Sequence, residues 1–315
     1  MRCGYLAAIP VLAFLALGCN DTTGPDILGE RVMLANQPFG AAISPNHVAY
    51  VTLGEAASLA RTSLPSRLFV PTVSVGSVPT EVVFNSTGSR AYVSNQFSQD
   101  VGVVDVATNS QIDIIAVNGD PFELIVQPGD SILYVATNAN NVYGIRLATK
   151  AVVVTIPTGN IGNGMLIRDS LLYISTRTNG TVIEFNLRTR TVSRTFPIGG
   201  VPQKLAISPD GNTLYIANEA DRITGYVQFW DRISGMQIGT NVPLSEAFGY
   251  DIARRPTDGL LYVSTAYSGW IYVIDPETRT IVRSVDAGGS TRTIVFDTNG
   301  VGFVTNEGGW VDFIK

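Results

Sequence analysis

The sequence predicts an all-β fold, a seven-bladed β-propeller with four-stranded antiparallel blades. The main observation is a pair of adjacent residues, one aromatic and one aliphatic, that recurs at spacings of 39 to 47 residues. A period of about 40 to 50 residues in strand-like sequence is typical of propeller blades, whereas sandwich domains need about 100 residues. With 45% hydrophobic and 15% charged residues, the chain has enough apolar material for a full core. The pairs begin at Tyr50, Tyr92, Tyr134, Tyr173, Tyr215, Tyr262 and Phe303.

The N-terminal segment predicts export from the cytoplasm and not a fold element. A single charged residue, Arg2, precedes an apolar run at residues 6–17. This run is too short for a membrane-spanning helix, which needs about 20 apolar residues. Residues 1–18 are therefore interpreted as a signal peptide. Residues 19–27 follow as a short polar tether, because Gly24 and Pro25 disfavour regular structure.

The end of this segment, Ala16-Leu17-Gly18-Cys19, resembles the lipobox of bacterial lipoproteins. The resemblance implies cleavage before Cys19, lipidation of its sulfur, and a lipid-anchored protein of the cell envelope, either periplasmic or at the surface. Ala16 stands where the family usually has Leu. The alternative is an ordinary secretory signal with an incidental cysteine. Lipidation is favoured because Cys3 lies in the removed segment, so Cys19 has no disulfide partner.

Each repeat has the same internal order of strands and turns. In the fifth repeat the turn Ser-Pro-Asp-Gly at residues 208–211 joins a first strand to a second strand that contains Tyr215. In the sixth repeat a third strand at 270–274 and a fourth at 280–285 are joined by a turn that begins with Asp275. An Asp or Asn at such a turn accepts a hydrogen bond from the backbone two residues later. Equivalent turns begin at Asp105, Asn186 and Asp231.

The two ends of the chain predict how the ring closes. Residues 310–315 form the third strand of the seventh repeat, and its fourth strand is missing. An additional strand at residues 31–35 precedes the first repeat. At the outer edge of the last blade, this N-terminal strand completes the blade and leaves only short, protected edges. The propeller is therefore expected to occupy residues 28–315, about 41 residues per blade, with little chain left for a second domain.

The repeats resemble those of the YVTN-repeat β-propeller family. The matching tetrapeptides are Tyr-Val-Ser-Asn at 92–95, Tyr-Ile-Ala-Asn at 215–218 and Phe-Val-Thr-Asn at 303–306. The resemblance covers about residues 35–315. It implies a secreted or surface-anchored binding propeller, and the wider seven-bladed group includes lactonases and lyases. Repeats one and four depart most, because residues 50–53 lack the Asn and residues 167–170 lack the Pro-Asp-Gly turn.

A ligand site is expected at one mouth of the central channel, where side chains at the start of the innermost strands converge. The alignment of repeats brings together three carboxylates, one Lys, one Arg and three aromatic rings. These candidate ligand-binding residues are Phe39, Glu81, Phe122, Glu123, Lys204, Tyr250, Asp251 and Arg292. Glu81, Glu123 and Asp251 are candidate Ca²⁺ ligands, because crowded carboxylates favour a shared cation. Alternatively, Lys204 and Arg292 neutralise the acids as ion pairs in an ordinary polar channel.

The composition excludes several functional classes. A net charge of −5 and a pI near 5.0 oppose nucleic-acid binding, which needs clustered Lys and Arg. One His and two Cys exclude His-based zinc sites and Cys-rich clusters. His47 is expected in a surface turn, away from the channel mouth. Aromatic residues near the third strands are expected to pack between blades, with a partner surface as the alternative; they are Trp230, Tyr267, Trp270 and Trp310.

The function that these observations favour is a monomeric, lipid-anchored binding scaffold for an extracytoplasmic protein, peptide or glycan. It has no predicted catalytic residues and no cofactor, and it meets the membrane through its lipid anchor only. The alternative is a lactonase-like, lyase-like or metal-dependent enzyme, in which Glu81, Glu123 and Asp251 act as metal ligands or as acid–base groups. Loss of turnover in Glu123→Gln would distinguish an enzyme from a scaffold.

Overall fold

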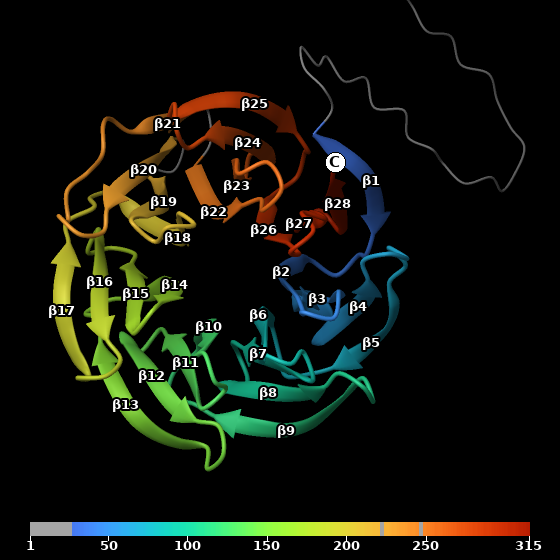
Figure 1. Ribbon diagram of the computed structural model, residues 1–315. Coiled ribbons are helices and arrows are strands. Elements are labelled where there is room, and N and C mark those ends of the chain that lie inside the picture. The colour runs from blue at the N-terminus through green and yellow to red at the C-terminus, as the bar shows by residue number, and fades with distance from the viewer. Residues whose placement is uncertain (1–26, 221–223, 246–247) are drawn as a thin grey trace, which may run out of the picture.

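The computed structural model describes residues 27–220, 224–245 and 248–315. Its strands form seven four-stranded antiparallel sheets, which are the blades of a ring around a central channel (Figure 1). The predicted seven-bladed β-propeller is therefore confirmed. Within the described residues the one helical element is the 3-10 turn η1 (Gly54–Ala56), and no helix there is long and apolar enough to cross a membrane. The predicted signal peptide and Cys19 lie outside the described residues.

Each blade runs from an inner strand at the channel to an outer strand at the rim. The inner strands are β2 (Pro38–Ile43), β6 (Pro79–Phe84), β10 (Pro121–Val126), β14 (Gly162–Arg168), β18 (Val201–Ile207), β22 (Phe248–Arg254) and β26 (Thr291–Phe296). The second strands are β3 (Val48–Leu53), β7 (Arg90–Asn95), β11 (Ile132–Thr137), β15 (Leu171–Thr176), β19 (Thr213–Glu219), β23 (Leu261–Ala266) and β27 (Gly302–Asn306).

The two remaining positions of each blade complete the sheets. The third strands are β4 (Ser58–Ser63), β8 (Asp100–Asp105), β12 (Asn141–Arg146), β16 (Thr181–Asn186), β20 (Gly225–Asp231), β24 (Trp270–Asp275) and β28 (Trp310–Ile314). The outer strands are β5 (Val70–Ser74), β9 (Ser110–Ala116), β13 (Ala151–Pro157), β17 (Thr191–Phe196), β21 (Val242–Leu244), β25 (Thr280–Asp286) and, in the last blade, β1 (Leu28–Met33).

The core lies between neighbouring blades, because the second and third strands are covered on both faces. One apolar cluster combines Tyr92 and Val101 of the second blade with Leu124 and Val135 of the third. The repeated tyrosines are central to this packing, and Tyr50, Tyr134, Tyr173 and Tyr262 are among the largest fully buried side chains. Burial of such an aromatic ring excludes a large apolar area from water, which explains why the pair recurs once per blade.

The ring closes through the N-terminal strand, as predicted. β1 pairs antiparallel with β28, and Arg31 lies opposite Asp312 in this pair (Figure 1). Arg31 Nε donates to Asp312 Oδ1 at 2.7 Å, so an ion pair joins the two ends of the described chain. The strand occupies residues 28–33 and not the predicted 31–35, because positive φ angles at Ala35 and the two residues after it turn the chain toward the first blade.

The turns between third and outer strands follow the predicted side-chain pattern. Asp275 Oδ1 accepts a hydrogen bond from Glu277 N at 2.8 Å, and Asp231 Oδ1 accepts one from Ile233 N at 3.0 Å. Backbone donors stabilise the charged form, so Glu277 N holds the pKa of Asp275 below its ordinary value, and Ser234 N, with a smaller contribution from Ile233 N, does the same for Asp231. The two acids therefore act as turn formers.

Candidate functional site in the central channel

Every inner strand contains a β-bulge near its start, next to the residues that the sequence analysis selected. In β6 the register shifts between Pro79 and Glu81, and in β10 it shifts between Pro121 and Glu123. The other five inner strands show equivalent shifts. A bulge re-aims the local side chain. This repeated irregularity therefore places one residue of each blade at the same level of the channel.

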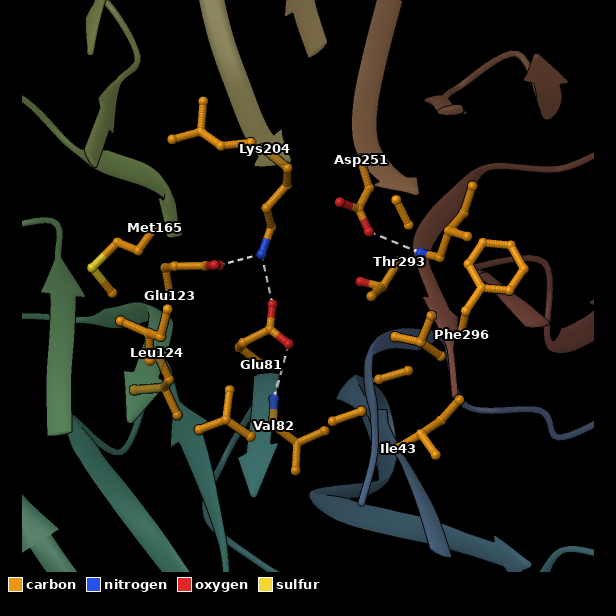
Figure 2. Close-up of a pocket in the computed structure, with 18 of the residues that line it drawn as sticks. Ile43, Glu81, Val82, Glu123, Leu124, Met165, Lys204, Asp251, Thr293 and Phe296 are labelled. Carbon is orange, nitrogen blue, oxygen red and sulfur yellow. Dashed lines mark hydrogen bonds and ion pairs between the residues drawn. The ribbon is translucent and has the colours of Figure 1, made fainter. Parts of the chain in front are cut away.

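We call Glu81, Glu123, Lys204, Asp251 and Thr293, which share this level, the charged layer. Lys204 Nζ lies between two carboxylates and donates to Glu81 Oε2 at 2.7 Å and to Glu123 Oε2 (Figure 2). All five residues are less than 10% exposed. The sequence predicts the four charged residues at a channel mouth, whereas the structure places all five residues inside the channel. The predicted neutralisation of acids by Lys204 is present in this geometry.

Asp251 has different partners from the two glutamates. Its Oδ1 accepts from Ile252 N and its Oδ2 accepts from Ile294 N, each at 2.8 Å. Glu81 likewise accepts from Val82 N at 3.1 Å through Oε1 (Figure 2). These amides lie on the channel-facing edges of inner strands, where no further strand pairs with them. Glu81 therefore satisfies a backbone donor in addition to binding Lys204, whereas Asp251 satisfies two backbone donors.

Blades one and four contribute glycines at this level, because a side chain there would collide with the backbone of the next blade. A Cβ at Gly40 would overlap the carbonyl oxygen of Thr80, and a Cβ at Gly164 would overlap that of Gln203. The charged layer is asymmetric as a result, with its acids and its lysine on the remaining blades.

Burial controls the ionisation of the charged layer. Burial raises the pKa of Glu123 to about 8, against a smaller opposing effect of the Lys204 ammonium. Burial also raises the pKa of Asp251. The pKa of Lys204 lies well above its ordinary value, because attraction to Glu123 and Glu81 outweighs desolvation. Burial therefore favours the protonated form of Glu123, whereas the neighbouring acids keep Lys204 charged.

In each inner strand, the residue one position before the level of the charged layer belongs to a second layer. This second layer lies at the end of the channel where the inner strands begin, and we call that end the start face. Phe39 contacts Phe122 and Tyr250 edge-on, with ring centroids 6.2 and 6.0 Å apart. The Arg292 guanidinium lies 4.9 Å from the Phe39 ring, 4.7 Å from the Tyr250 ring and 5.3 Å from the Tyr267 ring. We call these five residues the aromatic–arginine cluster. Their mutual contacts cross the channel at the start face.

A cavity of about 430 Å³ lies on the other side of the charged layer. Its lining includes all five residues of that layer and none of the aromatic–arginine cluster. From the charged floor it extends along the inner strands to their last residues, among them Ile43, Arg254 and Phe296. The cavity therefore opens beside the turns that join inner and second strands, and we call this the hairpin face.

The three predicted metal ligands share one level of the channel, but their carboxylates have separate partners. Within the described residues, no group of three or more His, Cys, Asp or Glu side chains is arranged to hold a metal ion. The Lys204 ammonium lies between Glu81 and Glu123, and Asp251 is bound to backbone amides. The site as built is therefore organised around a lysine.

The structure also places His47 and the aromatic residues that were predicted to lie near the third strands. His47 is in the turn after β2, as expected, and its Nδ1 lies 2.7 Å from Oδ2 of Asp297 in the last blade. Trp230 is buried and packs edge-on against Phe196 of the fourth blade, which agrees with packing between blades. Tyr267 differs from that expectation, because it is 74% exposed on the start face.

Two functional neighbours were missed by the sequence analysis. Glu307 Oε2 accepts from Arg292 Nη2 at 2.9 Å and so neutralises the arginine of the cluster. Asp297 holds His47 across the seam between the last and first blades. Both acids lie in loops after a strand, where acidic residues are common. No local pattern distinguishes them from ordinary turn residues.

Comparison with known proteins identifies the fold and no family. No family model matches the chain, and no curated protein matches it. Among solved structures, hydrazine synthase of Kuenenia stuttgartiensis is similar, with a TM-score of 0.80 and 18% identity over 94% of this chain and 99% of that chain. A chain of the mitotic checkpoint complex is also similar, with a TM-score of 0.80 and 12% identity over 98% of both chains. At these identities the likeness supports the β-propeller fold alone.

Proposed function

We propose that this protein is a monomeric, lipid-anchored binding protein of the cell envelope, whose propeller presents its start face to an extracytoplasmic protein, peptide or glycan. The observation that carries the proposal is the aromatic–arginine cluster. Aromatic residues and arginine are enriched at interfaces and provide most of the energetically dominant contacts there.

The cluster is preorganised for binding. Arg292 is held between three rings and by Glu307, and it is only 8% exposed. Tyr267 packs on Phe248 with ring centroids 5.1 Å apart, yet most of its surface is exposed. Its φ of 67° is rare for a bulky residue, and such strain is often found at functional positions. A rigid exposed ring loses little conformational entropy on binding.

The binding proposal is tested by screening the purified protein against arrays of peptides and of glycans. The expected result is a ligand whose affinity falls at least tenfold in both Tyr267→Ala and Arg292→Ala. Phe97→Ala is the matched control, because Phe97 is 68% exposed but lies outside the cluster. Equal losses in all three variants would indicate non-specific adhesion and contradict the proposal.

The anchor is tested separately, through Cys19. We expect the wild-type chain to incorporate a labelled fatty acid and to sediment with membranes. Cys19→Ala should abolish both properties, whereas Cys3→Ala should leave both unchanged because Cys3 lies in the predicted signal peptide. Membrane association that persists without Cys19 would contradict lipid anchoring.

One observation favours the enzymatic alternative, namely a Glu123 carboxyl with a pKa of about 8 at the floor of a cavity. A carboxyl that is protonated near neutral pH is suited to act as a general acid. This candidate requires turnover of a substrate such as a lactone. That turnover would be lost in Glu123→Gln while the thermal unfolding of the protein stayed cooperative.

A further inference from the structure

Two polar groups that face the cavity make no hydrogen bond within the described residues. Thr293 is 6% exposed and lines the cavity, and its hydroxyl has no partner there. Glu123 binds Lys204 through Oε2, and its Oε1 has no partner within the same part of the chain. Figure 2 shows Thr293 and Glu123 on opposite sides of the space around the Lys204 ammonium. Both residues are largely buried yet border the cavity, so their free oxygens are available to an occupant of it.

The charged groups at the floor of the cavity favour a cationic ligand. Three carboxylates, those of Glu81, Glu123 and Asp251, share the floor with one ammonium, that of Lys204. The oxygens of Glu81 and Asp251 already accept hydrogen bonds. When Glu123 is ionised, its Oε1 therefore remains as the free carboxylate acceptor, with the Thr293 hydroxyl as a second acceptor. A cationic donor would pair with both, whereas an anion would meet an excess of negative charge.

The walls above the floor are apolar. Partly buried side chains of Val83, Ile125 and Val295 line the cavity, and Ile43 and Phe296 lie near its opening. In each inner strand about three residues separate the floor from the opening, a depth of about 10 Å at 3.3 Å per residue. A cavity with apolar walls above an acidic floor matches a short methylene chain with a charged amine at its end.

We propose that the channel cavity binds a primary alkylammonium group, with its ammonium at Glu123 and Thr293 and its methylene chain against the apolar walls. This site opens on the hairpin face, so it is independent of the start-face surface in the proposed function. The group belongs either to a free amine or to a lysine side chain of a partner protein.

The proposal is tested by calorimetric titration of the purified protein with pentylammonium. Pentanol has the same chain without the charge, and pentanoate has the opposite charge. We expect saturable binding of pentylammonium alone. Thr293→Val should weaken it about tenfold, which is the typical effect of losing one hydrogen bond to a charged group. Thr195→Val is the matched control, because Thr195 is exposed on the outer strand β17.

The pH dependence provides a second readout. The pKa of Glu123 near 8 reflects burial, with Lys204 lowering it and Glu81 and Asp251 raising it, while Arg254 lies farther out along the lining. A bound ammonium replaces the carboxyl proton, so its affinity should rise between pH 6 and pH 9, where the amine itself stays protonated. Glu123→Gln should weaken binding at least tenfold and remove this pH dependence, whereas Glu277→Gln at an exposed turn should change neither.

Each outcome has a defined meaning. Equal binding of pentanol, no binding of pentylammonium, or unchanged affinity in Thr293→Val would overturn the proposal. A lysine-containing peptide that competes with pentylammonium would support the site and assign the group to a partner protein. Binding of pentylammonium without such competition would support it as a site for a free amine. Tyr267→Ala should not affect any of these titrations, so a failure here is separate from a failure at the start face.

Discussion

The charged layer and the aromatic–arginine cluster occupy consecutive residues of the same inner strands, yet each neutralises its cation differently. Lys204 is paired with two carboxylates inside the channel. Arg292 lies against three rings and pairs with Glu307, whose side chain is 26% exposed. One step along a bulged strand thus moves a side chain from the floor of the cavity to the start face. Position relative to the bulge decides whether a cation is held by buried carboxylates or packed against aromatic rings.

The largest effect on stability is expected from Lys204→Met, which tests the role of the ion pairs in the charged layer. Removal of the one cation of the charged layer leaves Glu81 and Glu123 buried without their partner. We expect the free energy of unfolding to fall by about 3–5 kcal/mol, as measured by urea denaturation at pH 7. Lys150→Met is the control, because its pair with Asp113 is exposed and should contribute less than about 1 kcal/mol. Similar losses in both variants would contradict a special role for the buried pair.

The pH dependence of stability should also originate in the charged layer. The pKa of Glu123 is raised from 4.5 to about 8 in the folded protein, so the folded state keeps a proton that the unfolded chain has released. The free energy of unfolding should therefore decrease as pH rises from about 5 to 8, by on the order of 3 kcal/mol. The raised pKa of Asp251 acts in the same direction.

Urea denaturation at several pH values measures this slope. Glu123→Gln keeps the shape of the side chain and cannot ionise, so its curve should be flatter than that of the wild type. A wild-type protein whose stability rises over this interval would show that Glu123 is not held protonated by burial.

A smaller effect is expected from Phe39→Ala in the aromatic–arginine cluster. This change removes the ring that contacts Phe122, Tyr250 and Arg292. Because Phe39 is only partly buried, we expect a loss of about 2 kcal/mol, below the range typical of a fully buried phenylalanine. Thermal denaturation measures it, and a loss larger than that of Lys204→Met would reverse the ranking of the two layers.

The smallest effect on stability is expected from Tyr267→Ala. Tyr267 is exposed and strained, so its removal should change the free energy of unfolding by less than about 0.5 kcal/mol. Ligand binding at the start face should nevertheless be lost. A large loss of stability in this variant would assign Tyr267 a structural role in place of a binding role.

The sequence alone determined the architecture of this protein. The recurring aromatic-aliphatic pair and the turn residues are local properties, and they predicted the seven blades and the closing strand. The alignment of repeats also selected the residues that share one level of the channel, because equivalent positions of a repeat lie at equivalent places in a ring.

Only the tertiary structure decided which of these residues became partners. Lys204 pairs with Glu81 and Glu123, which lie 123 and 81 residues earlier in the chain. Arg292 pairs with Glu307, and His47 lies against Asp297. Contacts across a ring depend on bulge geometry, on the glycines at Gly40 and Gly164 that leave room for neighbouring backbone, and on the burial that follows. The contacts between blades have no local signal, because they depend on the distance between blades and not on the pattern within one.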